Sequence, residues 1–131
     1  MTEARRLFEE RHASVLRALD RLEEVRAMQP QPDHPLVDAA IQRFTFCIEL
    51  SCRVFQAALT LEDVEARTPK AALKSAYKAH WLDDEALWLA MLEDRHRTSH
   101  TYRQDIALEI LGRLPAYHAA AEALPGRLTP D

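Results

Sequence analysis

The chain has 131 residues, of which 47% are hydrophobic and 29% are charged, and its formal net charge at pH 7 is −4. This length suits a single domain over residues 1–131 with one hydrophobic core, and this composition excludes an intrinsically disordered chain. The negative net charge excludes a protein that coats nucleic acid with its whole surface, although it is compatible with a local basic patch.

The first half of the chain predicts two long helices. Apolar residues recur at steps of three, four and seven from Thr2 to about Met28, which predicts an amphipathic helix. The segment 30–32 contains two prolines and ends it. A second helix is predicted from residue 33 or 34 to about residue 61. It is apolar round most of its surface, so we expect other helices or another subunit to cover more than one of its sides.

Three further helices are predicted in the second half. Thr68 is expected to cap a helix that has Pro69 in its first turn and ends near residue 79. The acidic residues 83–85 start a fourth helix, which ends near residues 98–100. A fifth covers about residues 104–124, with Pro115 ending, kinking or dividing it, and a frayed tail is expected from about residue 125 to 131. Four or five helices with short connections predict an all-α antiparallel bundle.

The sequence also carries signals about the compartment. Its longest apolar runs, such as residues 87–92, are far shorter than the roughly 20 residues that a membrane-spanning helix needs. The first ten residues mix charged and apolar side chains and lack the apolar core of a secretion signal. Cys47 and Cys52 lie on one predicted helix at a spacing that separates them around its axis, so we expect reduced core thiols. These features predict a cytoplasmic protein with no membrane contact.

The predicted fourth helix carries an arginine on its apolar stripe. At steps of four, three and four, this stripe runs through Trp88, Leu92, Arg95 and Ser99. Placing a guanidinium there costs on the order of several kcal/mol unless the group is paired, reaches water or faces a cleft. Arg95 is therefore interpreted either as a structural partner of Glu49 or a rim residue, or as part of a functional cleft.

A histidine follows Arg95 in the same segment. His100 lies five residues further on, which is about 140° round an ideal helix, so the two side chains converge only if the helix ends or bends. The hydroxyls of Thr98 and Ser99 favour such an end because they compete for backbone partners. Histidine exchanges protons near neutral pH, and arginine binds phosphate through two parallel hydrogen bonds. The pair suits phosphodiester chemistry, and the alternative is a capping or surface histidine.

This segment also resembles a known signature. Arg95, His100 and Tyr102 match the pattern Arg-x-x-x-x-His-x-Tyr, which resembles that of the HEPN superfamily (higher eukaryotes and prokaryotes nucleotide-binding domains). His96 fits its preference for a polar residue directly after the arginine. Longer stretches resemble the branch of nucleotidyltransferase substrate-binding proteins: residues 42–46 with 49–50, residues 68–82 and residues 91–102. The chain departs from that branch where it reads Glu-Leu-Ser-Cys-Arg over residues 49–53 and where His80 replaces a glycine.

The resemblance implies a symmetric dimer in which two copies of the motif form one composite cleft. Active members are metal-independent endoribonucleases, so Arg95 would stabilise charge on the phosphorane and His100 would act as general base or acid, with His96 in support. RNA would be the substrate, because only RNA has a 2′-hydroxyl nucleophile. The implied partner is a nucleotidyltransferase antitoxin, and the resemblance implies no metal or other cofactor.

Alternatives remain open for Tyr102 and for the protein as a whole. In the paired systems, the nucleotidyltransferase can transfer adenylate to the motif tyrosine, which at Tyr102 would block the cleft; the alternative is a tyrosine that only packs at the helix junction. The alternative to a ribonuclease toxin is a non-catalytic substrate-binding or docking subunit of the nucleotidyltransferase. A purely structural helical dimer is the third interpretation.

Three weaker patterns have structural interpretations that we prefer. His96 and His100, with Asp94 nearby, have a spacing found in metal sites, but we expect no metal there. We expect both tryptophans, at positions 81 and 88, to be core residues rather than base-stacking platforms. A row of lysines is expected to be a solvated surface and not an RNA track: Lys70, Lys74 and Lys78.

Overall fold

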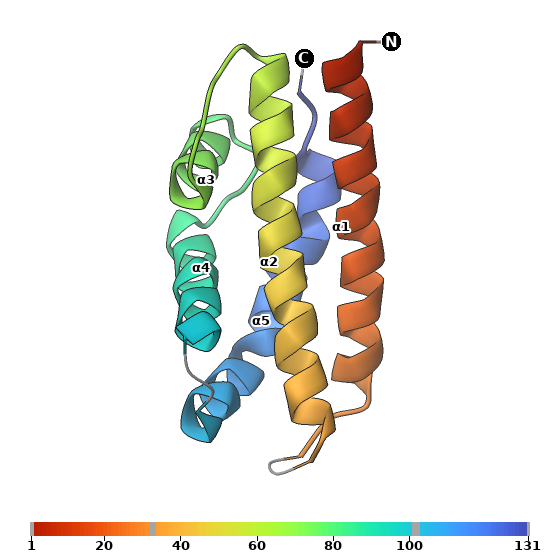
Figure 1. The fold of residues 1–131 in the computed structure, drawn as a ribbon, viewed down its shortest axis with the longest axis vertical. Helices are drawn as coiled ribbons and strands as arrows, with labels where there is room; N and C mark the ends of the chain where they lie inside the picture. The colour runs from red at the N-terminus through yellow and green to blue at the C-terminus, as the bar shows by residue number, and fades with distance from the viewer. Residues whose placement is uncertain (1, 32–33, 101–102, 131) are drawn as a thin grey trace.

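The computed structural model describes residues 2–31, 34–100 and 103–130, with the side chains of Ser99 and His100 left out. These ranges form five helices and contain no strand: α1 (Glu3–Ala27), α2 (Leu36–Leu61), α3 (Pro69–Lys78), α4 (Glu85–His100) and α5 (Gln104–Arg127). In Figure 1 the four longer helices run alternately down and up, and the short α3 lies between the end of α2 and the start of α4. The predicted all-α helical bundle is confirmed.

Local capping explains where three of these helices begin. The hydroxyl of Thr2 accepts a hydrogen bond from the backbone N–H of Arg5 at 3.1 Å, and α3 begins with the same contact, from the N–H of Ala71 to Thr68, also at 3.1 Å. A carboxylate oxygen of Asp84 accepts from the N–H of Leu87 at 3.0 Å, so this residue caps α4. The predicted starts of these helices are confirmed, while Asp33, one of the two residues at which the second helix was predicted to start, lies outside the described residues.

The core is built around α2, which packs against all four other helices. Its aromatic residues Phe44 and Phe55 are fully buried, and the ring of Phe55 meets that of Trp88 edge-on at 5.5 Å. Both tryptophans are buried, as predicted. Within the described ranges α2 is the one helix long and apolar enough to cross a membrane, but 56% of its most apolar window is buried in the bundle. That burial is typical of the core helix of a soluble protein.

The C-terminal part differs from the expectations in two respects. Of the three effects expected of Pro115, ending and dividing the helix are wrong, because α5 continues to Arg127, while a kink at Pro115 stays a prediction. Proline removes the hydrogen bond to the preceding turn, and the burial of Leu114 and Tyr117 on either side of it offsets that loss. The frayed tail expected from residue 125 is wrong for residues 125–128. Three of them are helical, and Leu128 is only 3% exposed.

Three side-chain contacts hold residues 125–128 in place. Arg127 forms an ion pair with Asp83, before α4, and donates a hydrogen bond to the carbonyl of His80 at 2.9 Å. His12 of α1 lies 3.2 Å from the carbonyl oxygen of Pro125. Residues 125–128 are held in place because they have partners distant in sequence, which helix-ending signals in the local sequence do not reveal.

Candidate functional site

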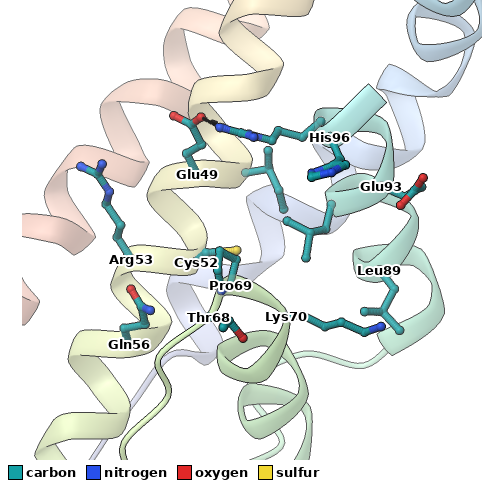
Figure 2. Close-up of a pocket in the computed structure, with 13 residues that line it drawn as sticks. Glu49, Cys52, Arg53, Gln56, Thr68, Pro69, Lys70, Leu89, Glu93 and His96 are labelled. Carbon is teal, nitrogen blue, oxygen red and sulfur yellow. Dashed lines mark hydrogen bonds and ion pairs between the residues drawn. The ribbon is translucent and has the colours of Figure 1, made fainter. Parts of the chain in front are cut away.

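A groove of about 890 Å³ lies between α2, the start of α3, and α4 (Figure 2). Its floor is mostly apolar and includes Ile48, Cys52, Leu89 and Leu92. The ionisable side chains that line the groove come from three helices, apart from the thiol of Cys52: Glu49, Arg53, Lys70, Glu93, Arg95 and His96. An apolar floor with a few convergent polar groups is typical of a ligand site.

Arg95 reaches across this groove from α4 to α2. Its Nε donates a hydrogen bond to Oε1 of Glu49 at 3.0 Å, and its Nη2 donates to the same oxygen, as the dashed contact at Glu49 in Figure 2 shows. The side chains are 31% and 35% exposed, so the pair sits at the rim and not in the core. The ion pair with Glu49 that the sequence offered as a structural interpretation is present. It lies in the groove, which makes Arg95 accessible to a ligand as well.

The buried stripe of α4 differs from the predicted one. It runs at steps of three through Trp88, Met91 and Asp94, which are each 2% exposed. Leu92 and Arg95 lie beside this stripe and are half-buried. The prediction placed Arg95 on the stripe because steps of four, three and four also fit a helix face, and only the packing of α4 against α5 separates the two faces. The side chain of Ser99, which was predicted to continue the stripe, lies outside the description.

The remaining motif residues follow Arg95 directly. His96 is exposed and lines the groove beside Arg95 (Figure 2). The hydroxyl of Thr98 takes a backbone partner, because it donates to the carbonyl of Arg95 at 2.7 Å. The helix nevertheless continues to His100, so the helix end that was expected between Arg95 and His100 is not found there. The side chain of His100 and the whole of Tyr102 lie outside the described residues. Their convergence with Arg95 stays a prediction.

The sequence did not reveal a buried acidic residue next to Arg95. Oδ1 and Oδ2 of Asp94 accept hydrogen bonds from Nη1 of Arg113 at 2.9 and 2.8 Å, and the hydroxyl of Tyr117 donates to Oδ2 at 2.6 Å. Arg97 adds a fourth hydrogen bond, at 3.1 Å to Oδ1. The signal that could have found this site is the step of three from Met91, together with the four-residue spacing of Arg113 and Tyr117 on one face of α5.

These contacts change the acid–base properties of the residues on α5. Burial is the main cause that raises the pKa of Tyr117 to about 12, and the hydrogen bond to Asp94 is the second cause. The hydrogen bond to Asp94 raises the pKa of the Arg113 guanidinium above its ordinary value. Tyr117 therefore keeps its proton and Arg113 its charge over the whole physiological range of pH.

The cysteines have no nucleophilic role at neutral pH. Both are free thiols, as predicted, and Cys52 lies in the floor of the groove. Burial raises the pKa of Cys47 and of Cys52 to about 12. Because the thiolate is the reactive form, a thiol with this pKa contributes to packing and not to chemistry.

The structure also shows where the residues of two weaker sequence patterns lie, namely the spacing typical of metal sites around His96 and the row of lysines on α3. Asp94 faces α5 and is engaged there, so it is not available as the third ligand beside His96. Among the described residues, no three side chains of His, Cys, Asp and Glu are grouped in a way that would hold a metal. The three lysines of α3 are exposed, and Lys70 lines the groove.

Comparisons with known proteins agree with this architecture. Residues 10–129 match the sequence model of a family described as nucleotidyltransferase substrate binding protein like. The protein named probable ribonuclease HepT, from Haemophilus influenzae, is 32% identical over 93 residues, which cover 66% of this chain and 64% of that protein. The chain thus spans slightly less than two-thirds of the length of this relative. A protein from Thermus thermophilus with a known crystal structure is 36% identical and has a TM-score of 0.79, over 87% of this chain and 98% of the other.

Proposed function

The chain belongs to the nucleotidyltransferase substrate-binding protein family of the HEPN superfamily, and we propose that it is a ribonuclease that cuts RNA without a metal ion. In this proposal two copies of the chain form the active site, and Arg95 and His100 of each copy carry the chemistry. A nucleotidyltransferase is its partner and acts as the antitoxin to this toxin. The relative named as a probable ribonuclease supports the reaction class.

The observation that carries the proposal is the position of Arg95. Its guanidinium is partly exposed at the rim of a groove, and the groove is large enough to accept an extended ligand. The bonds to Glu49 use Nε and Nη2, which fixes the plane of the guanidinium. A fixed arginine beside an apolar floor is suited to bind a phosphate while a nucleobase packs against that floor.

The reaction follows from these groups and from the chemistry of RNA. His100 of one copy takes the proton of the ribose 2′-hydroxyl, and the 2′-oxygen forms a bond to phosphorus. The bond from phosphorus to the 5′-oxygen breaks, and His100 of the second copy donates a proton to the leaving oxygen. The products are a 2′,3′-cyclic phosphate and a 5′-hydroxyl. Arg95 stabilises the negative charge that builds up on the phosphorane oxygens.

Two-fold symmetry supplies what a single chain lacks. One chain has one motif histidine, which must serve either as the acid or as the base in a given turnover. A symmetric dimer repeats the same surface, so it brings a second His100 and a second Arg95 to one cleft. This division of roles needs no metal ion.

A second candidate function is a non-catalytic subunit that binds the nucleotidyltransferase or its substrate. The description of the family supports it, and so does the ion pair between Glu49 and Arg95, which gives Arg95 a structural partner. In that function Arg95 and His100 bind a nucleotide or the partner protein, and RNA is not cut.

Cleavage of RNA in EDTA separates the two candidates. We expect the wild-type protein to cut RNA in the presence of the chelator and His100→Ala to lose this activity while size-exclusion chromatography still shows a dimer. His34→Asn, which alters an exposed histidine at the start of α2, is the matched control and should cut normally. Cleavage by His100→Ala at the wild-type rate would contradict the assigned role. An inert wild type that binds a nucleotidyltransferase would favour the second function.

A further inference from the structure

Asp94 is the buried centre of a cluster of charged residues that joins α4 to α5, and the other charged members of this cluster are partly exposed. Arg97 and Arg113 bind it, and both also contact Glu109, at 2.9 and 3.6 Å. Two carboxylates and two guanidiniums therefore balance in charge, and the hydroxyl of Tyr117 adds a further hydrogen bond to Asp94. A carboxylate that is only 2% exposed is stable when it is paired and hydrogen-bonded in this way.

The cluster lies outside the groove. Glu93 and Arg95 line the groove, whereas Asp94 between them does not, because adjacent residues on a helix point about 100° apart. Asp94 contacts α5 while Arg95 contacts Glu49 of α2. A rotation of α4 that moved one of these side chains would also move the other.

Asp94 is also the last anchor of α4 before the motif. Trp88 and Met91 hold the earlier turns in the core, and Asp94 continues the same buried stripe. After it, the described side chains of α4 are half-buried or exposed. The turns that carry Arg95 and His100 thus depend for their attachment to α5 on the buried contacts of Asp94 and on the more exposed ion pair between Arg97 and Glu109.

We propose that Asp94 is a positioning residue, which fixes the rotation of the end of α4 through Arg113 and Tyr117 and thereby aims Arg95 into the groove. The inference rests on the proposed function in one respect, because its effect on catalysis requires that Arg95 binds the phosphate. The positioning itself is a property of the fold and can be measured without RNA.

Two variants and a control test this role. Asp94→Asn removes the charge, and Tyr117→Phe removes a single hydrogen bond while it keeps the buried ring, so the second variant remains informative if the first does not fold. Asp83→Asn is the control, because it removes the charge from another ion pair of α5, the one with Arg127, at the opposite end of α4 from the motif. All three are compared below the midpoint of their unfolding curves, where each is folded.

The first measurement is the NMR signal of the Arg95 Nε–H group, assigned with Arg95→Lys. We expect this signal to shift and its hydrogen exchange to speed up in Asp94→Asn and, to a smaller extent, in Tyr117→Phe, and to stay unchanged in Asp83→Asn. A purely structural role would leave the Arg95 signal of the folded variants as in the wild type. That outcome would overturn the inference, whatever the activity.

The second measurement is the kinetics of RNA cleavage. We expect kcat to fall by about 10- to 100-fold in Asp94→Asn with a smaller change in KM, since a small misplacement of a group that acts in the transition state has effects of this size. Normal kcat in a folded Asp94→Asn overturns the inference. A wild type that cuts no RNA overturns the proposed function instead, and the Arg95 signal then decides the inference alone.

Discussion

Glu49 and Arg95 join the central helix α2 to α4 through two hydrogen bonds that share one carboxylate oxygen, the first of them 3.0 Å long. The side chains of Glu49 and Arg95 are 35% and 31% exposed, so each is partly accessible to solvent, and both line the groove. The carboxylate thus has two effects on Arg95, because it orients the guanidinium and also offsets its charge. The two effects can be separated by mutation.

Glu49→Gln keeps an acceptor oxygen and removes the charge, whereas Glu49→Ala removes both. We expect Glu49→Gln to tighten the binding of an uncleavable 2′-O-methyl RNA by about fivefold, which corresponds to the roughly 1 kcal/mol of a partly exposed ion pair. Glu49→Ala should instead lower kcat, because Arg95 loses its orientation. Fluorescence anisotropy and cleavage rates measure the two effects.

Glu93→Gln is the matched control for Glu49, since Glu93 is an acidic residue of the same groove on the other helix. It should change RNA binding less than Glu49→Gln does. Equal tightening by both variants would mean that general charge, and not the contact with Arg95, sets the affinity.

Adenylylation of Tyr102 is a prediction from the motif, and it can be tested with the nucleotidyltransferase proposed as the partner. Incubation with the nucleotidyltransferase and ATP should add the mass of one adenylate per chain, and Tyr102→Phe should gain none. The added phosphate would compete for Arg95 with the scissile phosphate, so modified protein should cut RNA more slowly. Intact-mass spectrometry gives the answer, and an equal mass gain in the variant would assign the modification to another residue.

The ordered C-terminus predicts a cost for truncating Leu128. We expect Leu128→Ala to lower the free energy of unfolding by about 2–3 kcal/mol, because this side chain is only 3% exposed. Leu16→Ala, at a leucine that is 45% exposed, is the control and should change stability by no more than about 0.5 kcal/mol. Urea denaturation of the three proteins measures both values. Similar costs for the two variants would mean that the tail does not pack as described.

The buried thiols predict a loss of stability in alkali. In the unfolded chain they titrate near the ordinary value of 9.0, while burial raises the pKa of Cys47 and Cys52 to about 12 in the fold. The contribution of the two buried thiols to the free energy of unfolding is therefore complete below pH 9, and it is lost as the pH rises from 9 towards 12. A variant with both cysteines replaced by alanine should show a flatter decline in unfolding free energy between about pH 9 and 11. Parallel curves for the two proteins would contradict the assigned cause.

Much of the fold could be predicted because its signals are local. Thr2 and Thr68 begin helices by contacts within the next three residues, and the apolar repeat of α2 specifies a helix that is covered on several sides. The end of α5 could not be predicted in this way. Proline and glycine near residue 125 favour an end, but burial of Leu128 and the ion pair of Arg127 outweigh that preference.

The candidate site likewise has features that the local sequence predicts and others that depend on tertiary packing. The sequence by itself determined the helical class, the family signature at Arg95, His100 and Tyr102, and the choice of Glu49 as a partner of Arg95, since these depend on spacing and residue type. Only the tertiary structure showed that Asp94, and not Arg95, continues the buried stripe of α4. Both assignments fit a helical period, and the packing of α4 against α5, with Arg113 and Tyr117 as donors, decides between them.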